Sequence, residues 1–87
     1  MLLAQGRLAE AGTLLEGAVT VHSKVDGPEH WRTAWARGAR GEWRARTGDG
    51  KGANDDLQSA WAVLSKRPED DARRKVTQVR MEKYAAP

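Results

Sequence analysis

The supply of large aliphatic side chains is the feature that most constrains the fold of this chain. Its 87 residues include seven Leu and six Val, but neither Ile nor Phe. That share lies below the roughly one fifth of Leu, Ile, Val and Phe that separates globular from disordered chains. The net charge of only +3 lacks the imbalance typical of disorder. Four Trp and many Ala offset the shortage, because Trp buries a large apolar area and Ala favours helix. The composition therefore predicts an all-α protein held together by Ala and Trp.

Apolar residues recur at intervals of three and four along most of the chain, which is the spacing of a helix face. Gly and Pro separate these segments. The helices are expected at residues 7–25, 29–46, 56–67 and 69–84, with a turn at 47–55. In the first helix, one packing face is expected from Leu8, Ala11, Leu14, Leu15, Ala18, Val19, Val21 and Val25. In the last helix, a thin apolar face is expected from Ala72, Val76, Val79 and Tyr84.

A residue pattern repeats between the first and third helices at a constant offset of 42 residues. Helix pairs that repeat with a period of about 20 to 50 residues are typical of solenoids, in which each pair packs on the next. The first copy of the pattern contains Gly6, Ala11, Leu15, Ala18, Val21, Ser23 and Lys24. The second contains Gly48, Ala53, Leu57, Ala60, Val63, Ser65 and Lys66.

This pattern resembles the second half of a tetratricopeptide repeat. The stretch "AQGRLAEAGTLLEGAVTVHSKVDGPEHWRTAWAR", residues 4–37, is similar to the long-period repeats of kinesin light chain. It is most similar to the repeat arrays of bacterial serine/threonine protein kinases, whose period is about 42 residues rather than the usual 34 or so. The resemblance covers about residues 4–66.

The resemblance implies a right-handed solenoid of antiparallel helix hairpins with about one and a half repeats. Residues 1–27 would form a partial repeat, 28–67 a second, degenerate repeat, and 68–87 a terminal helix. In "GPEHWRT", it assigns His30, Trp31 and Thr33 to the passage between repeats, at the start of a helix. It also places Gly41 at the small-residue position of that helix.

The second repeat departs from the family pattern at three positions. Arg40 and Arg44 stand where the family has large apolar residues, and Gly50 stands where Leu8 stands in the first unit. A buried Arg is costly unless its charged group reaches water. The sequence therefore predicts loose packing here, or the end of the array.

No motif in the chain indicates catalysis. The segment "GDGKGAND" lacks the first Gly, the preceding strand and the Ser or Thr of a phosphate-binding loop, and the kinase motifs are absent. His22 and His30 are the only His residues and the chain has no Cys, so no metal-ligand set is present. Asp55 and Asp56 are expected to favour a helix N-terminus rather than to act as acid or base. We expect a protein that is not an enzyme and that binds no metal or cofactor.

Arg37, Arg40 and Arg44 are spaced three and four apart and so share one helix face. Three interpretations remain open. The row is a solvated face, or it binds an acidic or phosphorylated peptide in the groove that the family resemblance implies. Alternatively, Arg and Trp interleaved in "HWRTAWARGARGEWRAR" form a basic, stacking surface for nucleic acid.

The function expected from these observations is a non-enzymatic protein–protein interaction module or scaffold segment, of the kind associated with bacterial serine/threonine kinases. Self-association through residues 1–15 is also expected, because Leu2, Leu3 and Leu8 have no preceding helix to cover them. No apolar run reaches the roughly 20 residues of a membrane span, and the N-terminus does not resemble a signal peptide. A cytoplasmic protein without membrane contact is expected.

Overall fold

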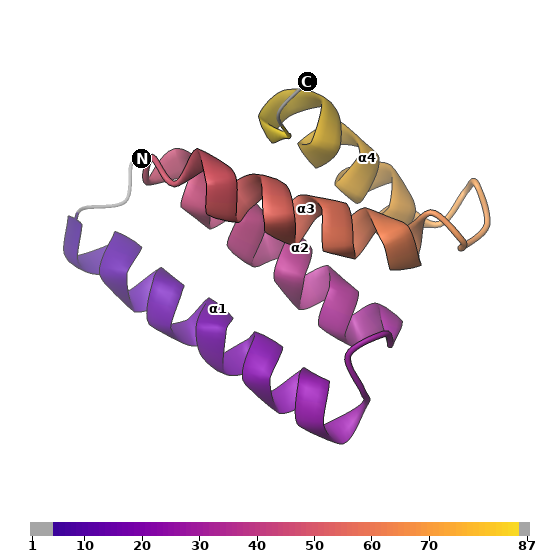
Figure 1. Ribbon diagram of the computed structural model, residues 1–87, viewed down its shortest axis with the longest axis horizontal. Helices are drawn as coiled ribbons and strands as arrows, with labels where there is room; N and C mark the ends of the chain where they lie inside the picture. Colours follow the sequence, from indigo (N-terminus) through magenta and orange to yellow (C-terminus); the bar gives the residue numbers. More distant parts are fainter. Residues whose placement is uncertain (1–4, 86–87) are drawn as a thin grey trace.

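The computed structural model describes the backbone of residues 5–85 and the side chains of residues 9–85. Over this range it contains four helices and no strand (Figure 1). They are α1 (Gln5–Val25), α2 (Trp31–Arg46), α3 (Gly50–Leu64) and α4 (Ala72–Tyr84). The predicted all-α class is confirmed. Within residues 5–85, no helix combines the length and apolar character needed to cross a membrane.

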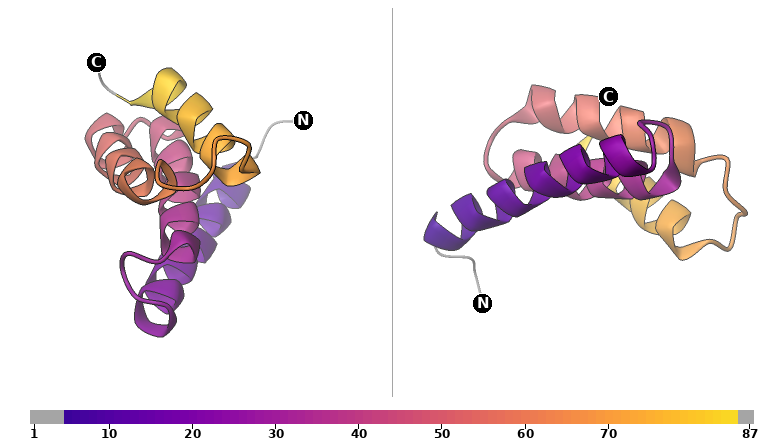
Figure 2. Two further views of the ribbon diagram at one scale, coloured as in Figure 1. Left: turned by 90° about the vertical axis from the view of Figure 1, so that its right-hand side faces the viewer. Right: turned by 90° about the horizontal axis from the view of Figure 1, so that it is seen from below.

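The four helices are arranged around α2. Successive helices from α1 to α3 run in opposite directions, and α4 crosses behind α2 and α3 (Figures 1 and 2). The most extensive contact joins α2 to α3, and α4 touches both. Among the described residues, α1 contacts only α2. One long side of α1 is therefore left uncovered.

The core lies between α2 and α3 and consists mainly of small residues. Its fully buried members are Thr33, Ala34, Ala53, Leu57, Ala60 and Leu64. At Gly41 the helices come so close that an added Cβ would lie 2.9 Å from the Leu57 Cγ and 3.1 Å from the Asp56 Cβ. The small residue expected at Gly41 is needed for this contact.

The predicted turn at 47–55 is too long, because α3 already begins at Gly50. Gly48 reverses the chain with a φ of 94°, which residues other than Gly rarely adopt. The Asp49 carboxylate then accepts a hydrogen bond of 2.9 Å from the backbone N–H of Gly52. Glycines that favour a loop in isolation are thus held in the first turn of a helix by an N-cap.

The packing face predicted for α4 is wrong. Val76 and Val79 point largely outward, and Val79 is 59% exposed. The fully buried residue of α4 is instead Thr77, whose hydroxyl donates to the backbone carbonyl of Arg73 at 2.8 Å. Arg73 and Arg80 flank it along the same helix face. Polar residues, rather than the Val residues, therefore face the core.

Guanidinium groups from α4 replace the missing apolar contact by lying over Trp rings of α2. Arg73 is 4.2 Å from the centre of the Trp31 ring, and Arg80 is 5.0 Å from that of Trp35. A cation over an indole face is attracted by the ring quadrupole, and the Arg stem covers apolar surface at the same time. The short supply of large aliphatics thus does not prevent α4 from docking.

The single packing face predicted for α1 divides into two. Val19 is buried against the rest of the molecule, and Gly12 lies close to the Trp43 ring. Leu14, Val21 and Val25 lie on the opposite side and are exposed. The apolar residues of α1 are numerous enough to supply two faces, and only one of them has a partner among the described residues.

Replacement of Gly41 by Ala tests the close contact between α2 and α3. Ala favours helix over Gly by about 1 kcal/mol, but overpacking costs about 1–3 kcal/mol. We expect a net destabilisation of about 1 kcal/mol in urea unfolding. Gly50→Ala is the matched control, because a Cβ at that position meets nothing within 4 Å. Equal stability of the two variants would contradict the contact.

Protonation of Asp71 is expected to destabilise α4 at acid pH. Its carboxylate accepts from the Arg67 side chain at 2.8 Å and from the backbone N–H groups of Arg73 and Arg74. The Arg67 hydrogen bond is the main cause that lowers the pKa of Asp71 below its ordinary 3.8. The unfolded chain therefore takes up the proton first, so stability is retained above about pH 4 and lost as the pH falls further.

Asp71→Asn keeps the capping oxygen but removes this titration. Urea unfolding at pH 7 and pH 3 should show a smaller loss for the variant than for the wild type. An identical loss in both proteins would show that Asp71 does not contribute to acid denaturation.

Candidate binding site

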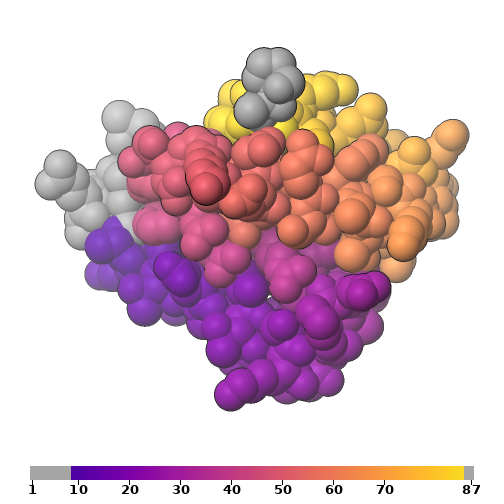
Figure 3. Space-filling view, in the orientation of Figure 1, coloured from indigo at the N-terminus to yellow at the C-terminus, as the bar shows by residue number. Residues whose placement is uncertain are grey.

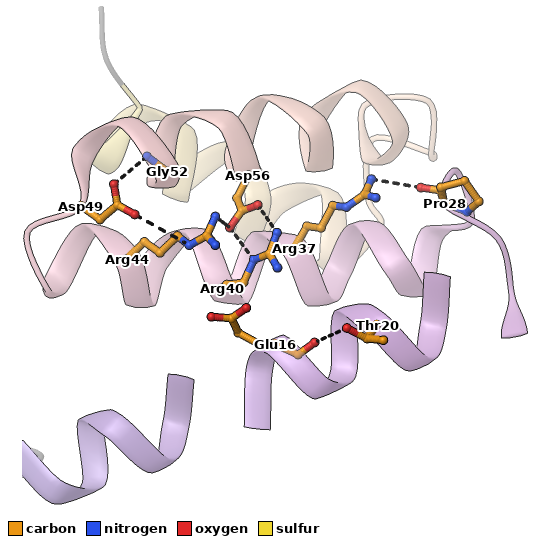
Figure 4. Close-up of polar contacts among 9 residues, drawn as sticks. All are labelled: Glu16, Thr20, Pro28, Arg37, Arg40, Arg44, Asp49, Gly52 and Asp56. Carbon is orange, nitrogen blue, oxygen red and sulfur yellow. Dashed lines mark hydrogen bonds and ion pairs between the residues drawn. The ribbon is translucent and has the colours of Figure 1, made fainter. Parts of the chain in front are cut away.

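The Arg row predicted from the sequence lies on the face of α2 that is turned toward α3 and α1 (Figure 4). Arg40 donates to both carboxylate oxygens of Asp56, from Nε at 2.8 Å and from Nη2 at 2.7 Å. Arg44 donates to the same carboxylate at 3.1 Å. Two cations of α2 thus share one acid of α3, and the pairing with Arg40 is bidentate.

The position of Asp56 corrects its expected role. It lies in the interior of α3, because this helix begins at Gly50, and its side chain is only 6% exposed. The Arg40 side chain is 17% exposed, so its charge is compensated by pairing rather than by escape to water. The hydrogen bond from Arg40 to Asp56 is the main cause that raises the pKa of Arg40, while burial opposes it. The Glu16 carboxylate, which points toward Arg40 in Figure 4, raises this pKa further.

Arg37 is also engaged within the chain. Its Nη1 donates to the backbone carbonyl of Pro28 at 3.1 Å, which ties α2 to the segment that precedes it. All three members of the predicted row therefore have intramolecular partners. Positively charged side chains that could bind a ligand therefore lie on another face of the molecule.

The residues that the resemblance assigned to the passage between repeats form the start of α2. His30 is the N-cap, and its Nδ1 accepts from the backbone N–H of Arg32 at 3.1 Å. The Thr33 hydroxyl is buried and donates to the Gly27 carbonyl at 2.7 Å. The Trp31 ring carries the Arg73 guanidinium. In the structure these residues hold a helix boundary.

The other pattern residues are distributed between the core and the face of α1 nearest α2. Ala53, Leu57 and Ala60 are fully buried in α3, whereas Ala11, Leu15 and Ala18 are half-buried in α1. Gly48 occupies the turn before α3. Gly6 lies in α1, but its side chain position is outside the described residues. The side chains of Leu2, Leu3 and Leu8 are outside the described residues too.

A groove of about 310 Å³ between α2 and α4 was not predicted from the sequence. Its lining is mainly apolar, and the two exposed lysines that border it, Lys75 and Lys83, form its rim. The lining residues are Glu42 and Arg46 of α2 and Lys75, Val76, Val79, Arg80, Lys83 and Tyr84 of α4. The signal was present in the sequence, because Lys75, Val76, Val79 and Lys83 share one helix face at spacings of three and four.

The groove carries an excess of positive charge. Its one acid, Glu42, is already paired with Arg46 and Arg80, each at 2.8 Å. Lys75 is exposed and has no ion-pair partner among the described residues. One nitrogen of Arg80, Nη1, is buried without a hydrogen-bond partner there. The hydroxyl of Tyr84 is the main cause that raises the pKa of Arg46, with Glu42 next. The groove therefore suits an anionic ligand with apolar groups.

The described part of the chain contains no cluster of three or more His, Cys, Asp or Glu that would hold a metal ion. Comparison with protein-family models finds none that matches, and comparisons with curated proteins and with solved structures find no match either.

Removal of the Asp56 carboxylate is expected to destabilise the protein strongly. Asp56→Ala leaves Arg40 and Arg44 without their acid in a partly buried site, which should cost about 3 kcal/mol in urea unfolding. Asp55→Ala, at the exposed neighbouring position, should change stability by less than about 0.5 kcal/mol. In the double variant Arg40→Met with Asp56→Leu, much of the lost stability should return. A loss for Asp56→Ala as small as that for Asp55→Ala would refute a structural role for the pair.

Proposed function

We propose that this chain is a non-enzymatic protein–protein interaction module or scaffold segment, and that it binds an acidic peptide in the groove between α2 and α4. A phosphorylated peptide is one form of such a ligand, because phosphate adds negative charge and acceptor oxygens. The proposal includes a tetratricopeptide-like arrangement of the helices. Its support is the 42-residue pattern, the pairwise packing of successive helices and the close approach at Gly41.

The observation that carries the proposal is the combination of exposed valines and exposed lysines in one groove. Val76 and Val79 are exposed and offer apolar surface in the groove. Lys75 and Lys83 stand on the same side of α4 and select for negative charge. Apolar anchors supply affinity and the charges supply specificity, which is the usual division in peptide recognition.

This site differs from the Arg row that the sequence suggested, although the class of partner is the same. Arg40 and Arg44 already bind the Asp56 carboxylate, so the lysines of the groove would select for a negatively charged peptide instead.

No observation favours the nucleic-acid alternative. Arg side chains already lie over the rings of Trp31 and Trp35, two of the three Trp residues of the stretch expected to stack on nucleic acid. A bacterial, kinase-associated, cytoplasmic protein remains part of the proposal, in keeping with the absence of Cys.

Charge reversal on the groove rim is the direct test. The probe is a fluorescein-labelled amphipathic peptide with Leu along one helix face and Glu elsewhere, measured by fluorescence anisotropy. Lys75→Glu with Lys83→Glu should weaken binding by about tenfold or more, because two attractive contacts become repulsive. The same peptide with Lys in place of Glu should bind the wild type poorly and the double variant better.

Lys66→Glu is the matched control, since Lys66 is exposed in the turn after α3 and lies outside the groove. It should leave the affinity within about twofold of the wild type. If the Glu and Lys peptides bind the wild type equally, or if Lys66→Glu weakens binding as much as the groove reversal, the proposed site is wrong.

A further inference from the structure

The outer face of α1 is apolar, uncovered and turned away from the rest of the molecule. Leu14 is 72% exposed, Val21 56% and Val25 76%. They lie on the side opposite Gly12 and Val19, which face α2. In Figure 3 this helix forms the lower border of the molecule, with the other helices only above it. A run of large apolar side chains on a free helix face indicates an interaction surface.

The spacing of this face is that of a two-helix seam. Leu14 and Val21 are seven residues apart. Val25 belongs to a second series at the same interval with Ala11 and Ala18, which are half-buried at the border toward α2. The two series alternate at three and four residues, which is the arrangement that packs one helix against another as a coiled coil. The ligand that fits this face is therefore a helix.

Gly17 lies at the edge of the seam and has no packing role inside the chain. A Cβ at this position would meet nothing within 4 Å, in contrast to Gly12 and Gly41. Gly weakens a helix relative to Ala, so its place in the middle of α1 has no intramolecular explanation in the described structure. A missing side chain at a seam edge lets a second helix come closer.

The charges beside the seam specify which helix this is. Glu10 and Lys24 are both exposed, and they lie seven residues before and after Gly17 on the same edge. In an antiparallel pair of two α1 helices, Gly17 stands opposite Gly17 of the second copy, and Glu10 stands opposite its Lys24. A parallel pair does not bring these opposite charges together. The face of α1 is thus electrostatically complementary to itself in the antiparallel orientation.

We propose that α1 is a homodimer interface, in which the α1 helices of two copies pack antiparallel about a twofold axis near Gly17 and Ala18. In this register Leu14 packs against Val21 of the second copy, and each Glu10 pairs with a Lys24. A twofold pair of identical surfaces closes on itself and forms a dimer rather than a filament. The interface is separate from the groove between α2 and α4, so both can be occupied in one molecule.

A charge-swap cycle on the complete chain tests the proposal. Sedimentation equilibrium over micromolar to millimolar concentrations gives the dimer dissociation constant of each variant. Glu10→Lys alone and Lys24→Glu alone each turn two attractive pairs into two repulsive ones and should weaken the dimer by about tenfold. The double variant Glu10→Lys with Lys24→Glu restores opposite charges and should return to within about twofold of the wild type. Within one helix the two positions lie about 21 Å apart, too far to interact directly in salt.

A second variant removes the apolar contact. Leu14→Arg should be monomeric at every concentration while its helix content stays unchanged, because Leu14 is exposed in the single chain. Lys66→Glu controls for charge changes outside the interface and should dimerise as the wild type does. A wild type that is monomeric at millimolar concentration overturns the proposal, as does a double variant that is as weak as the two single ones. The peptide-binding test of the groove is unaffected by either result, provided that it is performed at micromolar protein.

Discussion

The close contact between α2 and α3 across Gly41 is the constraint on which the rest of the structure depends. Because no Cβ stands between the helices there, α3 lies directly against α2 and buries Ala53, Leu57 and Ala60. The same contact brings Asp56 within reach of two α2 arginines, whose charges would otherwise be expensive to bury. It also fixes the rotation of α2, and so turns the rings of Trp31 and Trp35 toward α4.

Arginine acts as a packing residue in this protein. With few Leu and Val and no Ile or Phe, the chain joins its helices through paired guanidinium groups. One kind of contact is the shared carboxylate of Asp56, and the other is the stacking of α4 arginines on the Trp rings of α2. Both contacts are directional, unlike aliphatic packing, and each depends on one particular partner. The structure is therefore more sensitive to the loss of a single acid or Trp than a Leu-rich core would be.

Small and polar residues fill much of the interior, and several large aliphatic side chains therefore remain on the surface. On α4 this exposes Val76 and Val79 in a groove with cationic rims, and on α1 it exposes Leu14 and Val21 beside opposite charges. The two surfaces differ in chemistry. The groove has an excess of positive charge and fits a negatively charged partner. The α1 face carries both a negative and a positive charge and complements a second copy of itself. The proposed partner site and the proposed self-association site thus lie on separate helices, which agrees with the proposed scaffold function.

The sequence by itself determined that there are four helices and roughly where they are separated, because helix periodicity, Gly and Pro act locally, although it did not give the start of α3 at Gly50. The small residue at Gly41 was expected from the family resemblance. The sequence also predicted Trp31 and Thr33 at the start of a helix. The partners of Arg40 and Arg44 could not be read from it, since Asp56 lies on the next helix and becomes their neighbour only after α3 packs. For the same reason the buried face of α4 and the free face of α1 were decided by the tertiary structure. A helix with apolar residues on more than one side offers several packing faces, and only the contacts of its neighbours determine which is buried.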